Sequence, residues 1–283
     1  DETVAEVKNH QTLPIVLIQQ PNRGRLEARR AGLQIAQHEF VLFLDTRVFL
    51  DSSALSFVRP LLNDPASAIW TSHVVPELRN NVYAHFWYGI EGIFWSRYMA
   101  NPRTISFGYE EFDRFPKGTT ALIAPAAILR DAFDKFQPRI SDPKKVNDDT
   151  TILRSISETH AINISPSYSS TYHARSSMKS FMSHARHRGV VLIDGFVSSP
   201  TRLRTPILTT LGIAPIASVL LLFQPQFLVY PVVILPLLTS IVALSRGVSR
   251  TTAGVLALLF WPFSVSYLTG MYEGIYLRFF SSR

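Results

Sequence analysis

The chain has 283 residues, 47% of them hydrophobic, and a formal net charge of +7, enough for one large domain with an appendage. It contains no cysteine, which excludes disulfides and thiolate metal sites. No charged residue occurs between Arg204 and Arg246, and the basic residues gather just before this stretch. Anionic lipid head groups are therefore the expected partner of these basic residues, rather than nucleic acid.

Short apolar runs at 13–18 and 40–44 predict strands that are buried on both faces of a largely parallel sheet. A helix at 25–37 between them completes a βαβ unit. The expected elements that follow are helices at 52–62, 82–99, 125–135 and 148–158 and strands at 68–75 and 119–124. This alternation of helices and strands predicts an α/β fold.

The last quarter of the chain predicts membrane helices. Segments 206–223 and 227–244 each reach roughly 27 Å as helices, close to the thickness of the bilayer core. The polar break between them suits a tight hairpin. Segment 251–271 is a third candidate, which would span the bilayer, re-enter it or lie in its interface. Basic residues at 172–204 place the preceding domain in the cytoplasm, so we expect an integral protein of a bacterial cell membrane.

Asp45 directly follows the predicted strand at 40–44, at the sheet edge where open parallel sheets bind ligands. Its carboxylate could bind a divalent metal or a ribose hydroxyl, or it could serve only to cap a helix or form a turn. The local sequence favours neither interpretation over the other. Before it come Asn22-Arg23-Gly24 and Ala28-Arg29-Arg30-Ala31-Gly32. This order resembles the nucleotide-sugar half of the family 2 glycosyltransferases, which have a GT-A fold. The resemblance implies that Asn22, Gly24, Arg29 and Asp45 contact a nucleotide-sugar donor.

The residues after Asp45 depart from the pattern of that family. Its members carry Asp-x-Asp, whose two acids hold a metal that neutralises the leaving diphosphate, and Arg47 stands here in place of the second acid. The resemblance implies Mg²⁺ or Mn²⁺ bound by Asp45, because hard oxygen ligands suit these ions. Alternatively, Arg47 takes over part of this role through bidentate contact with phosphate oxygens.

Two adjacent acids, Asp148 and Asp149, open the predicted helix at 148–158. Acids at a helix start often serve only the cap and the helix dipole. Their position after Lys117-Gly118-Thr119-Thr120 is similar to that of the Glu-Asp pair of the family. The resemblance implies that Asp149 is the general base for the acceptor hydroxyl, that Asp148 raises its pKa, and that Gly118 and Thr119 bind substrate.

A basic segment, Ser183 to Gly189, precedes the apolar helices. The family often has a Gln-x-x-Arg-Trp motif here that clamps the diphosphate, and Arg186 and Arg188 are the residues available for that task. Attraction of these arginines to anionic lipid explains them equally well.

The resemblance divides the chain into a GT-A-like catalytic domain at 1–175, an amphipathic basic interface segment at 176–204 and a membrane domain of two or three helices at 205–283. Family members begin with a strand that is not found here, so we expect a fragment with an open sheet edge. The implied activity is inverting transfer of a single sugar, of the hexosyltransferase type, from a nucleotide-diphosphate-sugar to a lipid-linked or saccharide acceptor at the cytoplasmic membrane face. The alternatives are a non-catalytic membrane scaffold derived from such an enzyme and a processive polysaccharide synthase.

Overall fold

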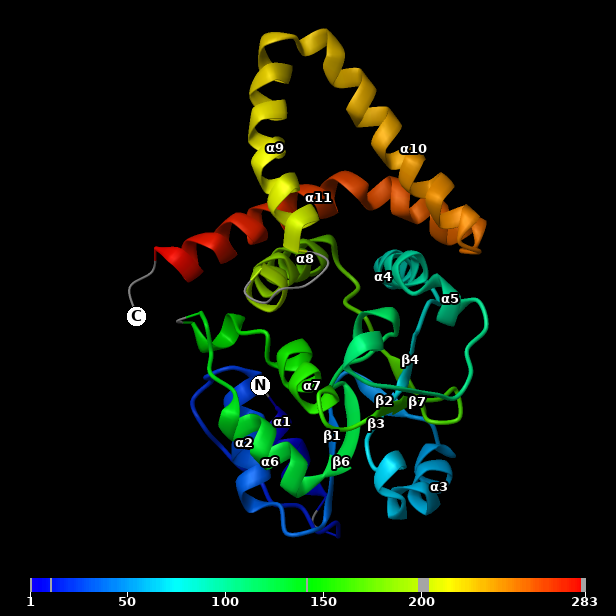
Figure 1. The fold of residues 1–283 in the computed structure, drawn as a ribbon, viewed down its shortest axis with the longest axis vertical. Helices are drawn as coiled ribbons and strands as arrows, with labels where there is room; N and C mark the ends of the chain where they lie inside the picture. Colours follow the sequence, from blue (N-terminus) through cyan, green and yellow to red (C-terminus); the bar gives the residue numbers. More distant parts are fainter. Residues whose placement is uncertain (1, 11, 141, 198–203, 281–283) are drawn as a thin grey trace.

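The computed structural model describes residues 2–10, 12–140, 142–197 and 204–280 and consists of an α/β part and a helical part beside it (Figure 1). The elements of the α/β part are α1 (Thr3–Asn9), α2 (Arg25–Ile35), β1 (Phe40–Leu44), β2 (Val48–Leu50), α3 (Ala54–Val58), η1 (Arg59–Asn63), η2 (Pro65–Ser67), β3 (Trp70–Thr71), β4 (His73–Pro76), α4 (Val82–Phe94), α5 (Ser96–Met99), β5 (Ile105–Phe107), η3 (Tyr109–Arg114), β6 (Ala121–Pro125), α6 (Ala126–Lys135), η4 (Pro143–Lys145), α7 (Asp148–Ser157), β7 (Ile162–Ile164) and β8 (Ser169–Tyr172). The elements of the helical part are α8 (Met178–Leu192), the π-helical turn η5 (Ile193–Val197), α9 (Arg204–Phe223), η6 (Pro225–Leu228), α10 (Val229–Ser245) and α11 (Arg250–Phe279).

The strands form two small mixed sheets, in the orders β1-β6-β3-β7-β5 and β2-β8-β4. The expectation of a largely parallel sheet is wrong, since four of the six strand pairs among the described residues are antiparallel. The apolar run at 40–44 correctly indicated the strand β1, but β1 is not buried on both faces, since only Phe43 of its residues is buried and Leu44 is 49% exposed. β6, in contrast, is buried from Ala121 to Ala124. Strand direction depends on the connections between strands, however, and β6 enters antiparallel between β1 and β3.

The predicted strand at 13–18 is not present. These residues form no strand, and their apolar side chains are exposed, with Val16 75% accessible. A buried strand needs a neighbour to pair with its backbone groups. Among the described strands, β1 lies at the edge of the larger sheet and pairs only with β6, so the run at 13–18 adds no strand to the open side of β1.

The helices cover the larger sheet from two sides. Leu26 and Leu33 of α2 share one core with Leu129 of α6 and Leu153 of α7, whereas Val58 of α3 belongs to a second core. Figure 1 shows α2, α6 and α7 on one side of β1 and β6 and α3 on the other. The first turns of α2 and α7 therefore lie on the same side of the sheet, near the end of β1.

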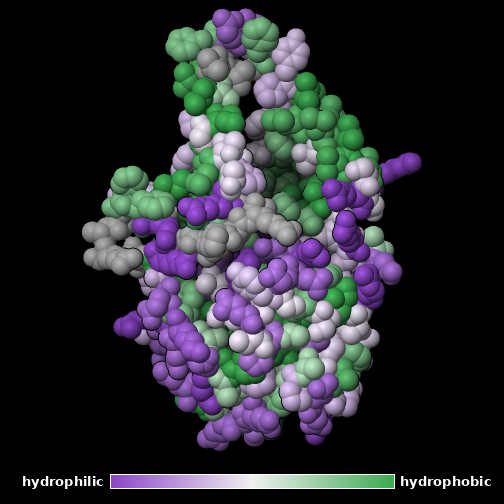
Figure 2. Space-filling view, in the orientation of Figure 1, coloured by the Kyte–Doolittle hydropathy of each residue, from purple (hydrophilic) through white to green (hydrophobic). Residues whose placement is uncertain are grey.

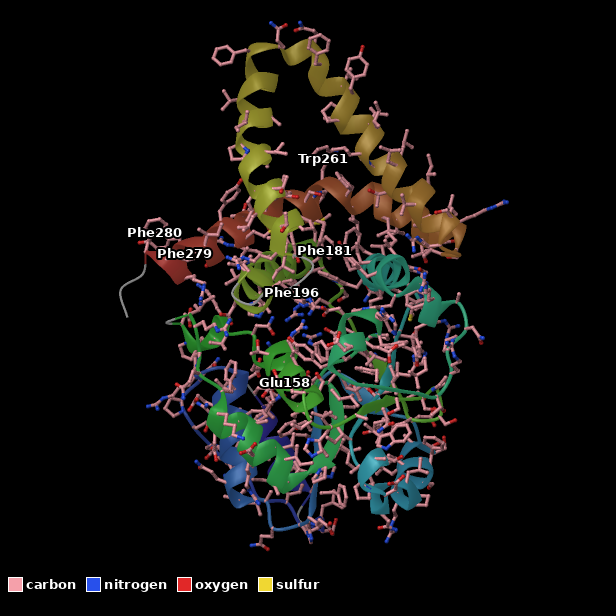
Figure 3. The ribbon with its side chains drawn as sticks, viewed as in Figure 1. Glu158, Phe181, Phe196, Trp261, Phe279 and Phe280 are labelled. Carbon is pink, nitrogen blue, oxygen red and sulfur yellow. The ribbon has the colours of Figure 1, made fainter. Side chains whose placement is uncertain are left out.

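In the helical part, α9 and α10 form an open hairpin that rises away from the sheets, and α11 lies across its base (Figure 1). Phe181 of α8, labelled beneath α11 in Figure 3, packs on Phe86 of α4 with ring centroids 5.1 Å apart. A Cβ at Gly270 of α11 would overlap the carbonyl of Arg186 in α8, so the two helix backbones touch. Close approach through glycine is a common way for apolar helices to pack.

The hairpin presents many exposed apolar side chains, seen as green surface in Figure 2, including Ile213, Ile216, Val233 and Leu237. By length and composition, α11 is the one helix of the described residues that could cross a membrane, and 28% of its most apolar window is buried inside the protein. α10 has 17 residues and is shorter. The predicted helices at 206–223, 227–244 and 251–271 therefore exist, whereas their position relative to a bilayer stays a prediction.

Candidate active site

The end of β1 lies beside the segment that leads into β6. β1 and β6 pair antiparallel, with Leu44 opposite Ala121, and the Asp45 N–H donates to the Thr120 carbonyl at 2.9 Å. Gly118 is held from the other side by Thr71, whose hydroxyl donates to the Gly118 carbonyl at 2.9 Å. Residues 118–120 and Asp45 are thus neighbours, although more than seventy positions separate them in the sequence.

Arg29 joins three predicted acids in one cluster. Its Nη2 lies 3.1 Å from Asp45 Oδ1, and its Nη1 lies 2.7 Å from Asp148 Oδ2 and 2.6 Å from Asp149 Oδ1. The guanidinium is only 9% exposed, so these contacts are largely shielded from solvent. We call Arg29, Asp45, Asp148 and Asp149, together with Arg25, the acid–arginine cluster. The sequence indicated Asp45 from a strand end and the two other acids from a helix start, and the structure brings all three together.

The first turn of α7 supplies two of these acids. Asn147 is the N-cap, and its Oδ1 accepts the Thr150 N–H at 3.1 Å. Asp148 and Asp149 therefore occupy the turn where the helix dipole favours negative charge. The Thr119 hydroxyl donates a short hydrogen bond to Asp149. Thr119 and Asp149, predicted separately as site residues, are thus in direct contact.

Arg25 was not among the predicted site residues. Its Nη2 lies 3.2 Å from Asp148 Oδ1, and its Nη1 lies 3.4 Å from Asp149 Oδ2. Arg25 precedes Arg29 by four positions, which puts both on one face of a helix. This four-residue spacing is the feature of the sequence from which Arg25 could have been predicted as a site residue.

The cluster shifts the pKa values of the two α7 acids in opposite directions. Burial alone would raise the pKa of Asp149, but Arg29, Arg25 and the Thr119 hydroxyl lower it to about 2. Burial, followed by the charge of Asp149, raises the pKa of Asp148. The expectation that Asp148 raises the pKa of Asp149 is therefore wrong here, because the two arginines outweigh the neighbouring acid.

Asn22 and Gly24 shape the turn that delivers Arg25. The Asn22 side chain accepts the Gly24 N–H at 3.2 Å, and Gly24 has φ +93°. A Cβ at Gly24 would lie 2.7 Å from the Pro143 carbonyl oxygen. Asn22 and Gly24 thus place the start of α2 against η4. Position 24 requires a glycine because the backbone there has a positive φ and because no Cβ fits beside the Pro143 carbonyl.

The predicted arginines Arg47, Arg186 and Arg188 occupy different environments. Arg47 is exposed in the turn after Asp45, where its carbonyl accepts the His173 N–H at 2.9 Å. Arg186 is bound to α11, with its Nε 2.7 Å from Glu273 Oε2. Arg188 lies over the Trp87 ring, 5.5 Å from its centroid. The structure does not join Arg186 to the acid–arginine cluster, so its proposed role as a clamp gains no support.

Positive charge from arginines acts on the neighbouring face of α8. Burial, followed by Arg188 and Arg175, lowers the pKa of His184 to about 2. Burial, followed by Arg25 and Arg188, lowers the pKa of His187 to about 4. Arg25 acts on both histidines, so this face of α8 lies near the acid–arginine cluster. Figure 3 shows side-chain nitrogens gathered between α8 and the α/β part. Such a region attracts anions.

Asp45 is the predicted metal ligand, and its side chain is 39% exposed. Among the described residues, no three His, Asp or Glu side chains form a group that could hold a metal ion. The Asp45 carboxylate already accepts a hydrogen bond from Arg29, and burial raises its pKa. Mg²⁺ at phosphate substrates is usually held by one or two carboxylates together with the phosphates. Asp45 is a single carboxylate that is already paired with a guanidinium, so by itself it does not fit a protein-built site for a divalent cation.

An α/β fold with mixed sheets and flanking helices, carrying acids and arginines at a strand end, is consistent with a GT-A transferase. Residues 1–136 match the family model described as glycosyl transferase family 2. This match supports a family 2 glycosyltransferase, a family whose members use a nucleotide-sugar donor and an acceptor. The match includes Asp45 and Thr119 but ends before Asp149, so the role of Asp149 stays a prediction. No curated protein matches the chain.

Proposed function

We propose that the protein is an inverting hexosyltransferase that moves a single sugar from a nucleotide-diphosphate-sugar to a lipid-linked or saccharide acceptor at the cytoplasmic face of a bacterial membrane. The observation that supports this most is the contact of Arg29 with both Asp45 and Asp149. In the proposal, Asp45 faces the donor and Asp149 faces the acceptor. One guanidinium links them, so the two substrates would meet within a single small site.

Asp149 is proposed as the general base. The acceptor hydroxyl would lose its proton to Asp149 while its oxygen attacks the anomeric carbon opposite the diphosphate, and the bond to the diphosphate would break with inversion. The lowered pKa, about 2, keeps Asp149 ionised and able to accept a proton at neutral pH. The same low pKa makes it a weak base while both arginines are bound to it.

Arg25 offers a way to strengthen this base when the donor is present. Its side chain is 46% exposed, and its two contacts are longer than those of Arg29. A donor diphosphate would compete with Asp148 and Asp149 for this guanidinium, because arginine binds phosphate in a bidentate way. Arg25 is one of the groups that lower the pKa of Asp149, so its move to the donor would raise that pKa.

The leaving diphosphate also needs positive charge, since its developing negative charge is the main target for electrostatic stabilisation. The exposed Arg47, next to Asp45, and the released Arg25 are proposed for this role. They are the neutralising groups in the proposal because Asp45 alone does not fit a protein-built metal site. Chelation with EDTA tests whether turnover needs the predicted Mg²⁺ or Mn²⁺ at Asp45.

The membrane location rests on the hairpin. α9 and the 17-residue α10 expose apolar side chains along their length, and arginines such as Arg246 and Arg250 lie at the base of α10 and α11. A surface of this extent and composition is typical of insertion into lipid. We propose that the hairpin enters the bilayer while α11, bound to α8 and α4, lies at its surface. The positive face of α8 would then meet anionic head groups or a phosphate-linked acceptor.

The experiment uses the full chain in vesicles that contain anionic lipid, with a panel of UDP-, GDP- and dTDP-sugars, and measures nucleotide release and sugar incorporation into lipid. Asp149→Asn removes the base and is expected to lower kcat at least 100-fold. Asp131→Asn is the matched control, because Asp131 forms an exposed pair with Lys135. Equal turnover by Asp149→Asn and wild type would remove Asp149 from the mechanism. No turnover by wild type with any donor would favour a scaffold.

A further inference from the structure

The start of α7 is fixed from outside the α/β part. The backbone N–H of Asn147 donates to Asp194 Oδ2 at 2.7 Å, and its side-chain Nδ2 donates to the Val191 carbonyl at 3.0 Å. Val191 lies in the last turn of α8, and Asp194 lies in the π-helical turn η5. Asn147 is also the N-cap of α7, so one buried residue both caps this helix and anchors it to the helical part.

The backbone of η5 packs directly on Asn147. A Cβ at Gly195 would overlap the Asn147 amide nitrogen and lie 2.9 Å from Asn147 Cγ. Only a glycine leaves room for this contact. π-helical turns are rare and are frequently found at functional sites. The close packing leaves little room for Asn147 to move relative to η5.

A second contact ties the same segment to α11. Lys145 Nζ lies 2.8 Å from Glu273 Oε1, and the other oxygen of Glu273 accepts from Arg186 Nε at 2.7 Å. Residues 145–147, which lead into Asp148, are therefore attached both to η5 and to α11. Neither contact belongs to the sheet that positions Asp45.

The buried position of Asp194 is expected to lower the stability of the fold. It is 4% exposed, and among the described residues its Oδ1 accepts no hydrogen bond. Burying a carboxylate with one oxygen unpaired costs stability, and an apolar residue of similar size would avoid this cost. An apolar residue could not accept the Asn147 N–H, and it could not attract Arg278 and Arg139 as the Asp194 carboxylate does.

We propose that Asp194 is a positioning residue, which acts through Asn147 to set Asp148 and Asp149 against Arg29 and the acceptor. The inference rests on the proposed transferase activity. In this arrangement the helical part sets the geometry of the base, while the sheet sets the geometry of the donor side. Misplacement of a reacting group by about 1 Å can cost about 100-fold in rate.

The test compares Asp194→Asn with Asp194→Leu in the full chain in anionic-lipid vesicles. Asn keeps an oxygen that can accept the Asn147 N–H, so kcat should stay within about 3-fold of wild type. Leu removes the acceptor, so kcat should fall about 10- to 100-fold while the donor KM stays within 2-fold. Asp131→Leu is the control for the loss of an acid. The proposal would be overturned if Asp194→Asn and Asp194→Leu changed kcat and the donor KM to the same extent. It would also be overturned if kcat were unchanged in Asp194→Leu.

Hydrogen exchange of peptides covering residues 142–153 gives a readout that needs no turnover. Faster exchange in Asp194→Leu, but not in Asp194→Asn, is expected, and equal exchange in both would overturn the proposal. Wild type that is inactive with every donor would contradict the proposed function, while this exchange comparison still decides the positioning role. Where Asp194→Leu does not fold, Gly195→Ala serves instead. It keeps Asp194 and displaces Asn147, so a fall in kcat is expected and an unchanged kcat would count against the proposal.

Discussion

Arg29→Met is the substitution that most directly tests the acid–arginine cluster. Methionine retains much of the apolar stem but leaves the buried Asp148 and the partly buried Asp149 without their closest cation. Removing one partner of a buried ion pair typically costs about 3–5 kcal/mol. Arg25 remains and compensates in part, so we expect Arg29→Met to lower the free energy of unfolding by about 3 kcal/mol at pH 7.

The loss should depend on pH in a defined direction. The pKa of Asp149 in the folded protein is about 2, below its ordinary 3.8. Its pairing therefore stabilises the fold above about pH 4, by about 2 kcal/mol, and this contribution is lost as pH falls towards 2. Without Arg29 the pKa of Asp149 is lowered less, because only Arg25 and the Thr119 hydroxyl remain to oppose burial, so the variant lacks part of this stabilisation above pH 4. The difference from wild type is thus largest at neutral pH and shrinks below pH 4.

Thermal unfolding of the full chain in detergent at pH 7 and pH 2.5 measures this difference. A cost of about 3 kcal/mol corresponds to a decrease in Tm of about 5–10 °C at pH 7, with a smaller decrease at pH 2.5, close to the folded-state pKa of Asp149. Arg114→Met is the matched control, because Arg114 forms an exposed pair with Glu111 and should change Tm by less than about 2 °C. Equal Tm values for the two variants at pH 7, or the same difference at both pH values, would refute the ion-pair reasoning.

Three further predictions concern the turn, the metal and the membrane. Gly24→Ala should lower the free energy of unfolding by about 1–2 kcal/mol and should lower kcat, because residue 24 has φ +93° and the added Cβ would crowd a carbonyl oxygen. Unfolding and turnover measurements on this variant check the prediction, and unchanged values of both would contradict it. Turnover in EDTA should fall less than about 3-fold, whereas Arg47→Ala should lower it more than 10-fold; complete loss in EDTA that Mn²⁺ restores would show a metal-dependent enzyme. Ile216→Lys with Val233→Lys should weaken flotation with anionic vesicles, since each lysine in the bilayer core costs about 3 kcal/mol, while Leu55→Lys should not; equal flotation of both variants would contradict insertion of the hairpin.

Local sequence patterns predicted most elements because helix formation and burial leave periodic signals. The predicted helices at 25–37, 125–135 and 148–158 correspond to α2, α6 and α7, and the run at 40–44 corresponds to β1. Shorter strands such as β8 (Ser169–Tyr172) escaped prediction because their polar sequence carries no apolar run. The strand at 13–18 was predicted wrongly, since an apolar run indicates burial only where a partner strand exists.

For the site, the sequence by itself determined which candidate residues are available: an acid at a strand end, a pair of acids at a helix start and arginines on the helix that precedes the strand. The tertiary structure alone decided how they combine. Arg29 bridges both acidic groups, and Arg29 and Arg25 together lower the pKa of Asp149 where the sequence predicted a raised one. Arg186 binds Glu273 of α11 instead of the cluster. The physical reason is that residue type and helical spacing are local properties, whereas ion pairing and burial depend on contacts between segments more than a hundred positions apart.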